Sequence, residues 1–371
     1  MISVEKKDAD AAWRTLASRL RRSGQLQESR DQPTTELLHV ATSITDPRQR
    51  VVFSRAINPA FAIAEVIWIL AGGDDLSFLA FWNPRIRRFS DDGLTLCGAY
   101  GYRIGSQPRI EAEAAGRLRH WTKTEEAPRI DQLRLAYETL QEMPTSRQVV
   151  IQIWDRTLDL PNPRIRSKDV PCNLVSHLMI RHGKLEWLQI MRSNDLFWGF
   201  PYNVIQFTTL QEIVAGWLGV GLGTYMHISD SLHAYQRHWN DLDTTSNRVH
   251  TKNPLNNASL AIKGYGPWEE TFSRVVSCAF KLTVLSSASD LVSIFESVSD
   301  ILPAYREWLA LLTAEALRRR GFGQDALKIA KAAGPYWGSS WRKWAHRAEA
   351  QRRVRTDSRF ELAGAAPQVR E

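Results

Sequence analysis

The sequence has few of the residues that build disulfide frameworks or metal sites. Its three cysteines, Cys97, Cys172 and Cys278, are scattered and odd in number, which argues against a disulfide framework and favours a reducing, cytoplasmic setting. No Cys-x-x-Cys or His-x-x-x-His spacing supports zinc, so we expect no metal. Neither a Gly-x-Gly-x-x-Gly nor a Walker-type loop is present, and no dinucleotide or P-loop fold is therefore indicated.

Long hydrophobic runs are also missing. The longest, residues 61–73, is too short to cross a bilayer and carries Glu65. The first ten residues are charged and lack the apolar core of a secretory signal. We therefore expect a soluble protein with no membrane partner.

Positive charge, by contrast, is in excess. The net charge is +8 and the isoelectric point lies near 9.5, which favours anionic partners such as nucleotides or polyanionic cofactors. The alternative is that the extra lysines and arginines only solvate the surface. The length of 371 residues allows one large domain, or one domain with an addition.

Two patterns of hydrophobic residues divide the chain. Up to about residue 265, strand and helix patterns mix, which predicts an α+β domain over 1–265. Strands are expected at 36–43, 51–54, 147–154, 174–180, 185–191 and 225–228, and helices at 8–26, 60–70, 76–82, 128–141, 202–218 and 233–242. Beyond it we expect a helical extension over 266–356, with helices at 269–282, 289–302, 304–319 and 325–333, and a disordered tail over 357–371.

Cys172 is the first candidate for chemistry. Pro171 precedes it and a strand follows, so it lies at an element boundary from which a side chain can project into a site. A thiolate is the reactive form, and a nearby arginine would lower the thiol pKa. Arg192 lies one hairpin strand away and could meet Cys172 across the sheet. The alternative is a small buried hydrophobe.

A group of arginines could bind phosphate. Arg30, Arg147 and Arg192 lie at loop or strand ends, and guanidinium groups that converge from separate segments match the oxygens of a phosphate. Ser193 adds a hydroxyl beside Arg192. Surface salt bridging remains the alternative for each arginine taken alone.

Four further polar residues could read a base or a sugar. Asn203 offers a donor and an acceptor on one edge, as needed for the adjacent C=O and N–H of a pyrimidine, or it could be a helix N-cap. Asp195 could likewise either contact a base or be a helix N-cap. His233 and Tyr235, two residues apart at an expected helix start, could both reach a sugar hydroxyl.

The order and spacing of these residues resemble the thymidylate synthase and pyrimidine hydroxymethylase family. The resemblance rests on Val170-Pro171-Cys172, on Met191-Arg192-Ser193-Asn194-Asp195, on Gly199-Phe200-Pro201-Tyr202-Asn203 and on His233-Ala234-Tyr235. Upstream, Ser146-Arg147-Gln148 resembles the phosphate strand of the family, Glu65 its catalytic glutamate and Ala99-Tyr100-Gly101 its active-site tyrosine loop. The match covers about residues 25 to 240.

The resemblance implies a fold with a large, kinked mixed sheet at a homodimer interface. It also implies a pyrimidine nucleoside monophosphate as substrate and 5,10-methylenetetrahydrofolate as cosubstrate, without need of nucleic acid. The implied catalytic residues are Cys172, which attacks C6, together with Glu65, Tyr100 and Asp195. The implied substrate-binding residues are Arg30, Arg147 from the other subunit, Arg192, Ser193, Asn203, His233 and Tyr235, and the implied folate-side residues are Asp195, Trp82 and Trp198.

Several positions depart from the synthase pattern. Asn173 follows the nucleophile where synthases usually have histidine, and Gln148 replaces the second arginine of the phosphate strand. Asp230 and Ser231 replace a Gly-Asp pair, and no short apolar C-terminus resembles the synthase tail that closes over the folate. In an open site, water rather than hydride would reach the C5 methylene and give a hydroxymethyl group.

Three hypotheses follow. Asn203 is of the uracil-reading type, so methyl transfer to dUMP leads by a narrow margin. The second hypothesis is a 5-hydroxymethylase that acts on dUMP, dCMP or CMP in a specialised pathway. The third is an inactive scaffold protein that uses the helical extension as its interaction surface, and the intact set of Cys172, Arg192, Asp195 and Asn203 argues against it.

Overall fold

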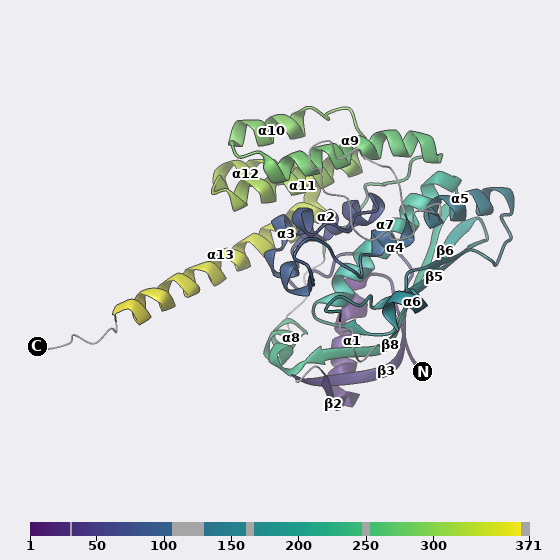
Figure 1. Ribbon diagram of the computed structural model, residues 1–371, viewed down its shortest axis with the longest axis horizontal. Coiled ribbons are helices and arrows are strands. Elements are labelled where there is room, and N and C mark those ends of the chain that lie inside the picture. The colour runs from purple at the N-terminus through teal and green to yellow at the C-terminus, as the bar shows by residue number, and fades with distance from the viewer. Residues whose placement is uncertain (30–31, 106–129, 161–166, 247–252, 365–371) are drawn as a thin grey trace, which may run out of the picture.

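An eight-stranded mixed sheet underlies the fold. The computed structural model describes residues 1–29, 32–105, 130–160, 167–246 and 253–364 (Figure 1). The main strands run in the order β1-β3-β8-β6-β5-β4, with β2 paired to β3 and β7 paired to β8. Their bounds are β1 (Ile2–Lys6), β2 (Gln25–Ser29), β3 (Gln32–Ile44), β4 (Val150–Gln152), β5 (Asn173–Arg181), β6 (Lys184–Met191), β7 (Asn194–Asp195) and β8 (Gly221–Tyr235). The α+β prediction is confirmed.

The hairpin of β5 and β6 forms where the sequence predicts it. His182 and Gly183 both have positive φ, 50° and 70°, as a tight two-residue connection between antiparallel strands requires. Along β6 the side chains alternate between buried and half-exposed, because one face packs against helices and the other does not. The hairpin sets the residues at its open end, Cys172 and Arg192, side by side.

The predicted helix over residues 233–242 is wrong in its first part. His233 and Tyr235 lie on β8, and the helical structure begins only with a 3-10 turn (Gln236–His238) and α8 (Trp239–Ser246). The alternation of buried residues along β8 changes phase near Asp230, opposite His39, which has a φ of 54°. The register between β3 and β8 is the same on both sides of this point, so the change of phase is a local distortion of both strands. It hides the strand period from a sequence pattern.

Two other predicted strands are corrected. Residues 51–54 form no strand; Val51 and Val52 are buried in a turn, and the amide of Val51 donates to the hydroxyl of Tyr336 (2.7 Å), so that a side chain takes the place of a sheet partner. The strand expected at 147–154 is reduced to β4, which pairs only with β5.

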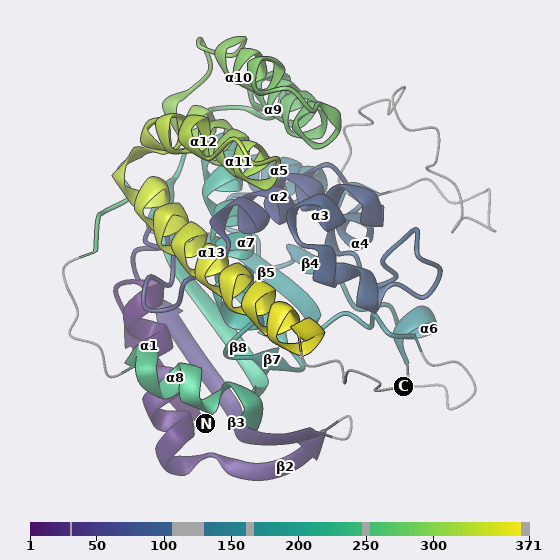
Figure 2. The same cartoon turned by 90° about the vertical axis from the view of Figure 1, so that its left-hand side faces the viewer.

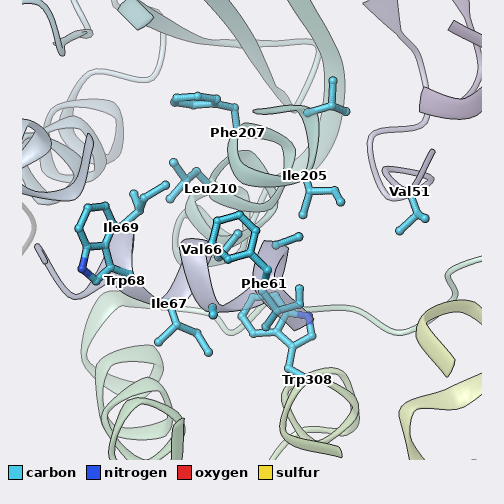
Figure 3. Close-up of a cluster of buried hydrophobic side chains, with 14 of the residues drawn as sticks. Val51, Phe61, Val66, Ile67, Trp68, Ile69, Ile205, Phe207, Leu210 and Trp308 are labelled. Atoms are coloured by element: carbon cyan, nitrogen blue, oxygen red, sulfur yellow. The ribbon is translucent and has the colours of Figure 1, made fainter. Parts of the chain in front are cut away.

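Helices cover the buried face of the sheet in layers. The first part of the chain provides α1 (Ala9–Ser23), α2 (Pro59–Leu70), α3 (Leu76–Trp82), the 3-10 helix η1 (Pro84–Phe89), α4 (Tyr100–Ile104), α5 (Gln132–Glu142), α6 (Arg156–Asp159) and α7 (Gly199–Leu218). Apart from Glu65, α2 is apolar on all sides because it lies inside the molecule, and Asn58 caps its first turn. Figure 3 shows it between Ile205, Phe207 and Leu210 of α7 and Trp308 on its other side.

The C-terminal helices form the outermost layer (Figures 1 and 2). They are α9 (Tyr265–Val284), α10 (Ala288–Glu296), α11 (Pro303–Arg319), α12 (Gly323–Ile329) and α13 (Gly334–Gly364). Their buried side chains belong to the same apolar core as the sheet and α2, so no break in the core marks residue 265. The division of the chain at that residue stays a prediction.

The tail differs from its prediction. Residues 357–364, expected to be disordered, continue α13, and 365–371 lie outside the described residues. Among the helices that the structure describes, none combines the length and the apolar character needed to cross a membrane.

Candidate active site

Cys172 and Arg192 meet at the open end of the β5–β6 hairpin, as the sequence predicts. The amide of Arg192 donates to the carbonyl of Cys172 (3.0 Å). Its Nε donates to Pro171 O (3.0 Å) and its Nη2 to Val170 O (3.1 Å). The guanidinium thus braces the backbone that carries the half-buried thiol.

The loop that carries Tyr100 is pressed against the same segment. The amide of Gly98 donates to Asp169 Oδ2 (2.8 Å), and a Cβ added at Gly98 would lie 3.1 Å from the nitrogen of Pro171. Burial raises the pKa of Tyr100, and the charge of the neighbouring Cys172 raises it further. Tyr100 therefore stays protonated beside the thiol and can donate its hydrogen.

Glu65 of α2 also lies near Tyr100, whose pKa its charge helps to raise. Burial raises the pKa of its carboxyl to about 8, and a hydrogen bond from Gln206 opposes that shift. Its Oε2 atom has no hydrogen-bond partner among the described residues. A carboxyl group that holds its proton near neutral pH can both donate and accept protons in a reaction.

Asn173, the residue after the nucleophile, is fully buried. Its Oδ1 accepts a hydrogen bond from Gln189 Nε2 (2.9 Å), and Gln189 Oε1 in turn accepts from Ser176 Oγ (2.5 Å). These bonds fix the amide, and its Nδ2 has no partner within the described part of the chain. The side chain also lies against Tyr100. The amide is thus held facing Tyr100, and it opposes part of the rise in the pKa of Tyr100 that burial causes.

Asn203 lies inside α7 and is buried, so it is not the N-cap that the sequence left as an alternative. Its Nδ2 donates to Gln206 Oε1 (3.1 Å), and its Oδ1 accepts from Asn194 Nδ2 (3.4 Å). Gly199 makes room for this contact, because a Cβ there would lie 3.3 Å from Asn203 Oδ1 and 3.4 Å from Asn194 Oδ1.

Behind Asn194 lie two buried residues of β8 that the sequence did not single out. Asn194 Nδ2 lies 3.0 Å from His227 Nε2, and His227 Nδ1 lies 2.9 Å from the hydroxyl of Tyr225. Burial lowers the pKa of His227 to about 3, so the imidazole is neutral. The alternating pattern of β8 would have placed both residues on the inner face; no motif marks them.

Asp195, His233 and Tyr235 lie together where β7 pairs with β8. Asp195 is in register with His233, and the amide of Leu196 donates to His233 O (2.7 Å). Asp195 Oδ1 accepts from the amides of Phe197 (2.7 Å) and Trp198 (3.2 Å). His233 and Tyr235 share one half-exposed face of the strand, with their ring centres 5.6 Å apart.

Arg55 is a third residue that sequence reasoning missed, after Tyr225 and His227. Only 3% of it is exposed, and its guanidinium lies 4.1 Å from the ring centre of Phe197 and 4.4 Å from that of Trp198. Burial lowers its pKa, whereas Tyr202 and Asp195 raise it. Its Nε and Nη1 atoms have no partner in the described residues. A single arginine in a turn carries no pattern that would reveal this position.

Positive side chains border this side of the site. Arg237 lies over Tyr235 (4.5 Å), and burial followed by repulsion from Arg237 and Arg85 lowers the pKa of Arg88. α13 makes two contacts with the segments around Arg55. Lys343 Nζ donates to Phe53 O (2.6 Å), and Arg347 Nη2 pairs with Asp241 Oδ2 (3.3 Å). The C-terminal layer therefore reaches the surroundings of Arg55.

Within the described part of the chain, three predicted site residues, Arg147, Trp82 and Ser193, make no side-chain hydrogen bond or ring contact with this cluster, and a fourth falls outside that part. Arg30 lies outside the described residues. The side chain of Arg147 is exposed, and its carbonyl accepts from His177 Nε2 (3.0 Å). Trp82 is fully buried, which removes it from direct ligand contact in this conformation. Ser193 is half-buried between β6 and β7.

Comparison with known proteins gives the same family as the sequence motifs. The family model described as thymidylate synthase matches residues 11–282 and so takes in α9. The chain is 37% identical over 227 residues to the deoxyuridylate hydroxymethyltransferase of Bacillus phage SP01, which covers 59% of this chain and 55% of that protein. It is also 35% identical over 201 residues to the protein of the same name from Pseudomonas phage M6. This match covers 53% of this chain and 51% of the phage protein.

A third relative is matched over most of its own length. The "Putative thymidylate synthase" of Methanocaldococcus jannaschii is 26% identical over 236 residues, which cover 63% of this chain and 91% of that protein. The chain spans only about half the length of the two phage proteins that it matches.

Proposed function

The chain belongs to the thymidylate synthase family, and on that premise we propose that it transfers a one-carbon unit from 5,10-methylenetetrahydrofolate to C5 of dUMP. The observation that carries the proposal is the cluster at the hairpin end. There Arg192 braces the backbone of Cys172, and Tyr100 lies beside the thiol. A nucleophile with an adjacent cation and an adjacent proton donor suits covalent catalysis on a pyrimidine ring.

The steps follow from these positions. The Cys172 thiolate adds to C6, and the electrons of the C5–C6 double bond move to C5, which then bonds to the one-carbon unit that the folate supplies. Tyr100, which keeps its own proton, assists removal of the C5 proton by holding the water that accepts it, and Glu65 exchanges protons through water, for which its raised pKa of about 8 is suited. Loss of the C5 proton lets the bond between the one-carbon unit and the folate nitrogen break, so tetrahydrofolate leaves and an exocyclic methylene remains at C5. Water adds to this methylene and gives the hydroxymethyl group, and release of the thiolate restores the C5–C6 double bond.

Substrate binding is assigned by chemistry and family position. Arg192 and Ser193 would hold the phosphate together with Arg30 and with Arg147 of a second subunit, so the proposal includes a homodimer. His233 and Tyr235 share a strand face from which both could reach the 3′-hydroxyl. Asn203 would read the base.

The folate would bind on the other side of the base, beside Asp195 and Trp198. Arg55 fits this assignment, because two of its buried nitrogen atoms lack partners among the described residues. Trp82, which is fully buried, would pack behind the folate-binding residues without touching the folate. The reaction is expected to take place in the cytoplasm and to need no metal, membrane or nucleic acid.

For the product we propose 5-hydroxymethyl-dUMP. Two relatives at 35–37% identity are named deoxyuridylate hydroxymethyltransferase. Unpartnered polar atoms of Glu65 and Asn173 near Tyr100 would also retain water next to the reacting carbon. Methyl transfer, which the sequence favoured, stays the second candidate; a relative with a synthase name supports it.

A product assay tests the proposal. The protein is incubated with methylenetetrahydrofolate and, separately, dUMP, dCMP, UMP or CMP, and the products are weighed by mass spectrometry. We expect dUMP to gain a hydroxymethyl group while tetrahydrofolate is released. Gain of a methyl group with dihydrofolate would select the second candidate. Turnover of none of the four nucleotides would refute both.

A further inference from the structure

The amide of Asn203 can read a base in two ways. Uracil presents a carbonyl oxygen and a ring N–H on the edge near C4, whereas cytosine presents an amino group and an unprotonated ring nitrogen. An asparagine amide has one donor end and one acceptor end of nearly the same shape. A half-turn about its last bond would therefore exchange a match to uracil for a match to cytosine. The base preference depends on what holds the amide in place.

Two neighbours hold the amide of Asn203 in one orientation. Gln206 offers it an acceptor, Oε1, at 3.1 Å from Nδ2, and Asn194 offers it a donor, Nδ2, at 3.4 Å from Oδ1. Turning the amide would set two donors against each other on one side and two acceptors on the other. All three residues are buried, and water is not at hand to repair such a mismatch.

Asn194 is held in turn by the pair behind it. Its Nδ2 donates to His227 Nε2 (3.0 Å), so this nitrogen carries a lone pair and Nδ1 carries the proton, which it donates to Tyr225 Oη (2.9 Å). Both residues are fully buried. Asn194 Nδ2 also lies 2.7 Å from Met191 Sδ, an acceptor. The hydroxyl of Tyr225 can donate or accept, so the acceptors at Met191 and His227 keep the amide nitrogen of Asn194 on this side, and Asn203 Oδ1 at 3.4 Å is its third and longest contact.

We propose that Asn194, oriented by the buried pair of His227 and Tyr225, is a positioning residue that fixes the amide of Asn203 and so sets the preference for uracil over cytosine nucleotides. The inference rests on the proposed function, since it takes Asn203 as the reader of the base. A second observation points to a ligand. Asn194 Oδ1 is buried without a partner among the described residues, 3.4 Å from where a Cβ of Gly199 would lie. It offers a further acceptor near the reading edge.

The variant Asn194→Asp tests the inference. A carboxylate only accepts, so Asn203 must turn its Nδ2 toward it, which exchanges the ends of the reading edge. We measure Kd for dUMP and for dCMP by calorimetry without folate, and kcat/KM for both. The expected result is a shift of the dCMP-to-dUMP preference toward cytosine by at least about tenfold, or about 1.4 kcal/mol. The control is Asn256→Asp, a buried amide far along the chain that bonds to Arg48 O (3.3 Å), which should leave the preference unchanged.

The outcomes separate this inference from the proposed function. If the wild-type protein bound neither nucleotide, the proposed function and the inference would both fail. If it bound dUMP and Asn194→Asp kept the same preference, or lost affinity for both nucleotides equally, the inference alone would be overturned. Should Asn194→Asp not fold, Asn194→Ser replaces it. That variant is expected to lose the preference for dUMP at least severalfold, and an unchanged preference would count against the inference.

Discussion

The two halves of α7 hold two buried polar clusters of different character. In the second half, Glu212 accepts from Arg48 Nε (3.0 Å) and Leu260 N (3.2 Å) and also pairs with Arg50, whose Nη1 donates to Thr209 Oγ1 (2.7 Å). In the first half, Asn203 bonds only to neutral amides. One cluster is ionic and joins loops distant in sequence; the other is neutral and lies beside the nucleophile.

The two clusters differ in how many of their buried polar atoms have hydrogen-bond partners. Both oxygens of Glu212 and the guanidinium of Arg50 are bonded within the protein, which suits a structural role. Around Asn203, Glu65 Oε2, Asn173 Nδ2 and Asn194 Oδ1 lack partners in the described residues. Buried polar atoms left without partners cost free energy, so such a group beside a thiol indicates a place for a ligand or water. The predictions below test that contrast.

The largest effect is expected at Arg192. A lysine there keeps the charge but cannot brace two carbonyls while it binds a phosphate, because it lacks the planar fork. We expect Arg192→Lys to lower kcat/KM for dUMP by about a hundredfold or more, with little change in thermal stability. Arg134→Lys, in an exposed pair with Glu138, is the control. Activity within twofold of the wild type would exclude Arg192 from the site.

Among the bonded residues around Glu212, a substitution should lower the free energy of unfolding and not the activity. Glu212→Gln leaves Arg50, which is fully buried, without its counter-charge, and such losses cost about 3–5 kcal/mol. Urea unfolding measures the change, and the ratio of dUMP to dCMP affinity in the surviving folded protein should stay the same. A changed ratio would mean that the two halves of α7 are coupled.

Glu65 should make stability depend on pH. Its pKa is raised from 4.5 to about 8 in the folded protein, so the native state holds a proton that the unfolded chain releases. Stability should therefore fall as pH rises between those values, by at most about 1.4 kcal/mol per pH unit. Glu65→Gln should lack this fall. Parallel slopes for the two proteins in urea titrations from pH 5 to 8 would contradict the assignment.

The smallest effect is expected on α13. Arg347 pairs with Asp241 at the surface and lies outside the family-matched region. Because partly exposed ion pairs are weak, Arg347→Gln should change stability by less than about 1 kcal/mol. The charge of Arg347 lowers the pKa of Arg55 by repulsion. Loss of the Arg347 charge should therefore alter KM for the folate only a few-fold and leave KM for dUMP unchanged. A large loss of kcat would instead place α13 in the catalytic machinery.

Local patterns predicted much of this fold. The β5–β6 hairpin and α2 were found because turn residues and apolar periodicity lie within a few positions of each other. Cys172 and Arg192 were expected to meet because a hairpin pairs residues at fixed offsets, and they do. The sequence predicts a helix for the strand that carries His233, because the alternation of buried residues changes phase at Asp230.

Long-range contacts account for what the sequence did not reveal. Asn194 and His227 are 33 positions apart and meet only because β6, β7 and β8 pair in parallel. Arg55 reaches Phe197 and Trp198 from a turn without periodic pattern. The motif showed Asn203 but not the residues that orient it, because hydrogen-bond direction depends on packing.

The central claim is that Cys172 forms the bond to the pyrimidine, and one paired measurement tests it directly. Wild-type protein and Cys172→Ala are incubated with dUMP and methylenetetrahydrofolate, and the nucleotides are weighed, with Cys278→Ala, in α9, as the matched control. We predict hydroxymethyl-dUMP from the wild type and from Cys278→Ala, and unchanged dUMP from Cys172→Ala. Product formed by Cys172→Ala at the wild-type rate would contradict the account.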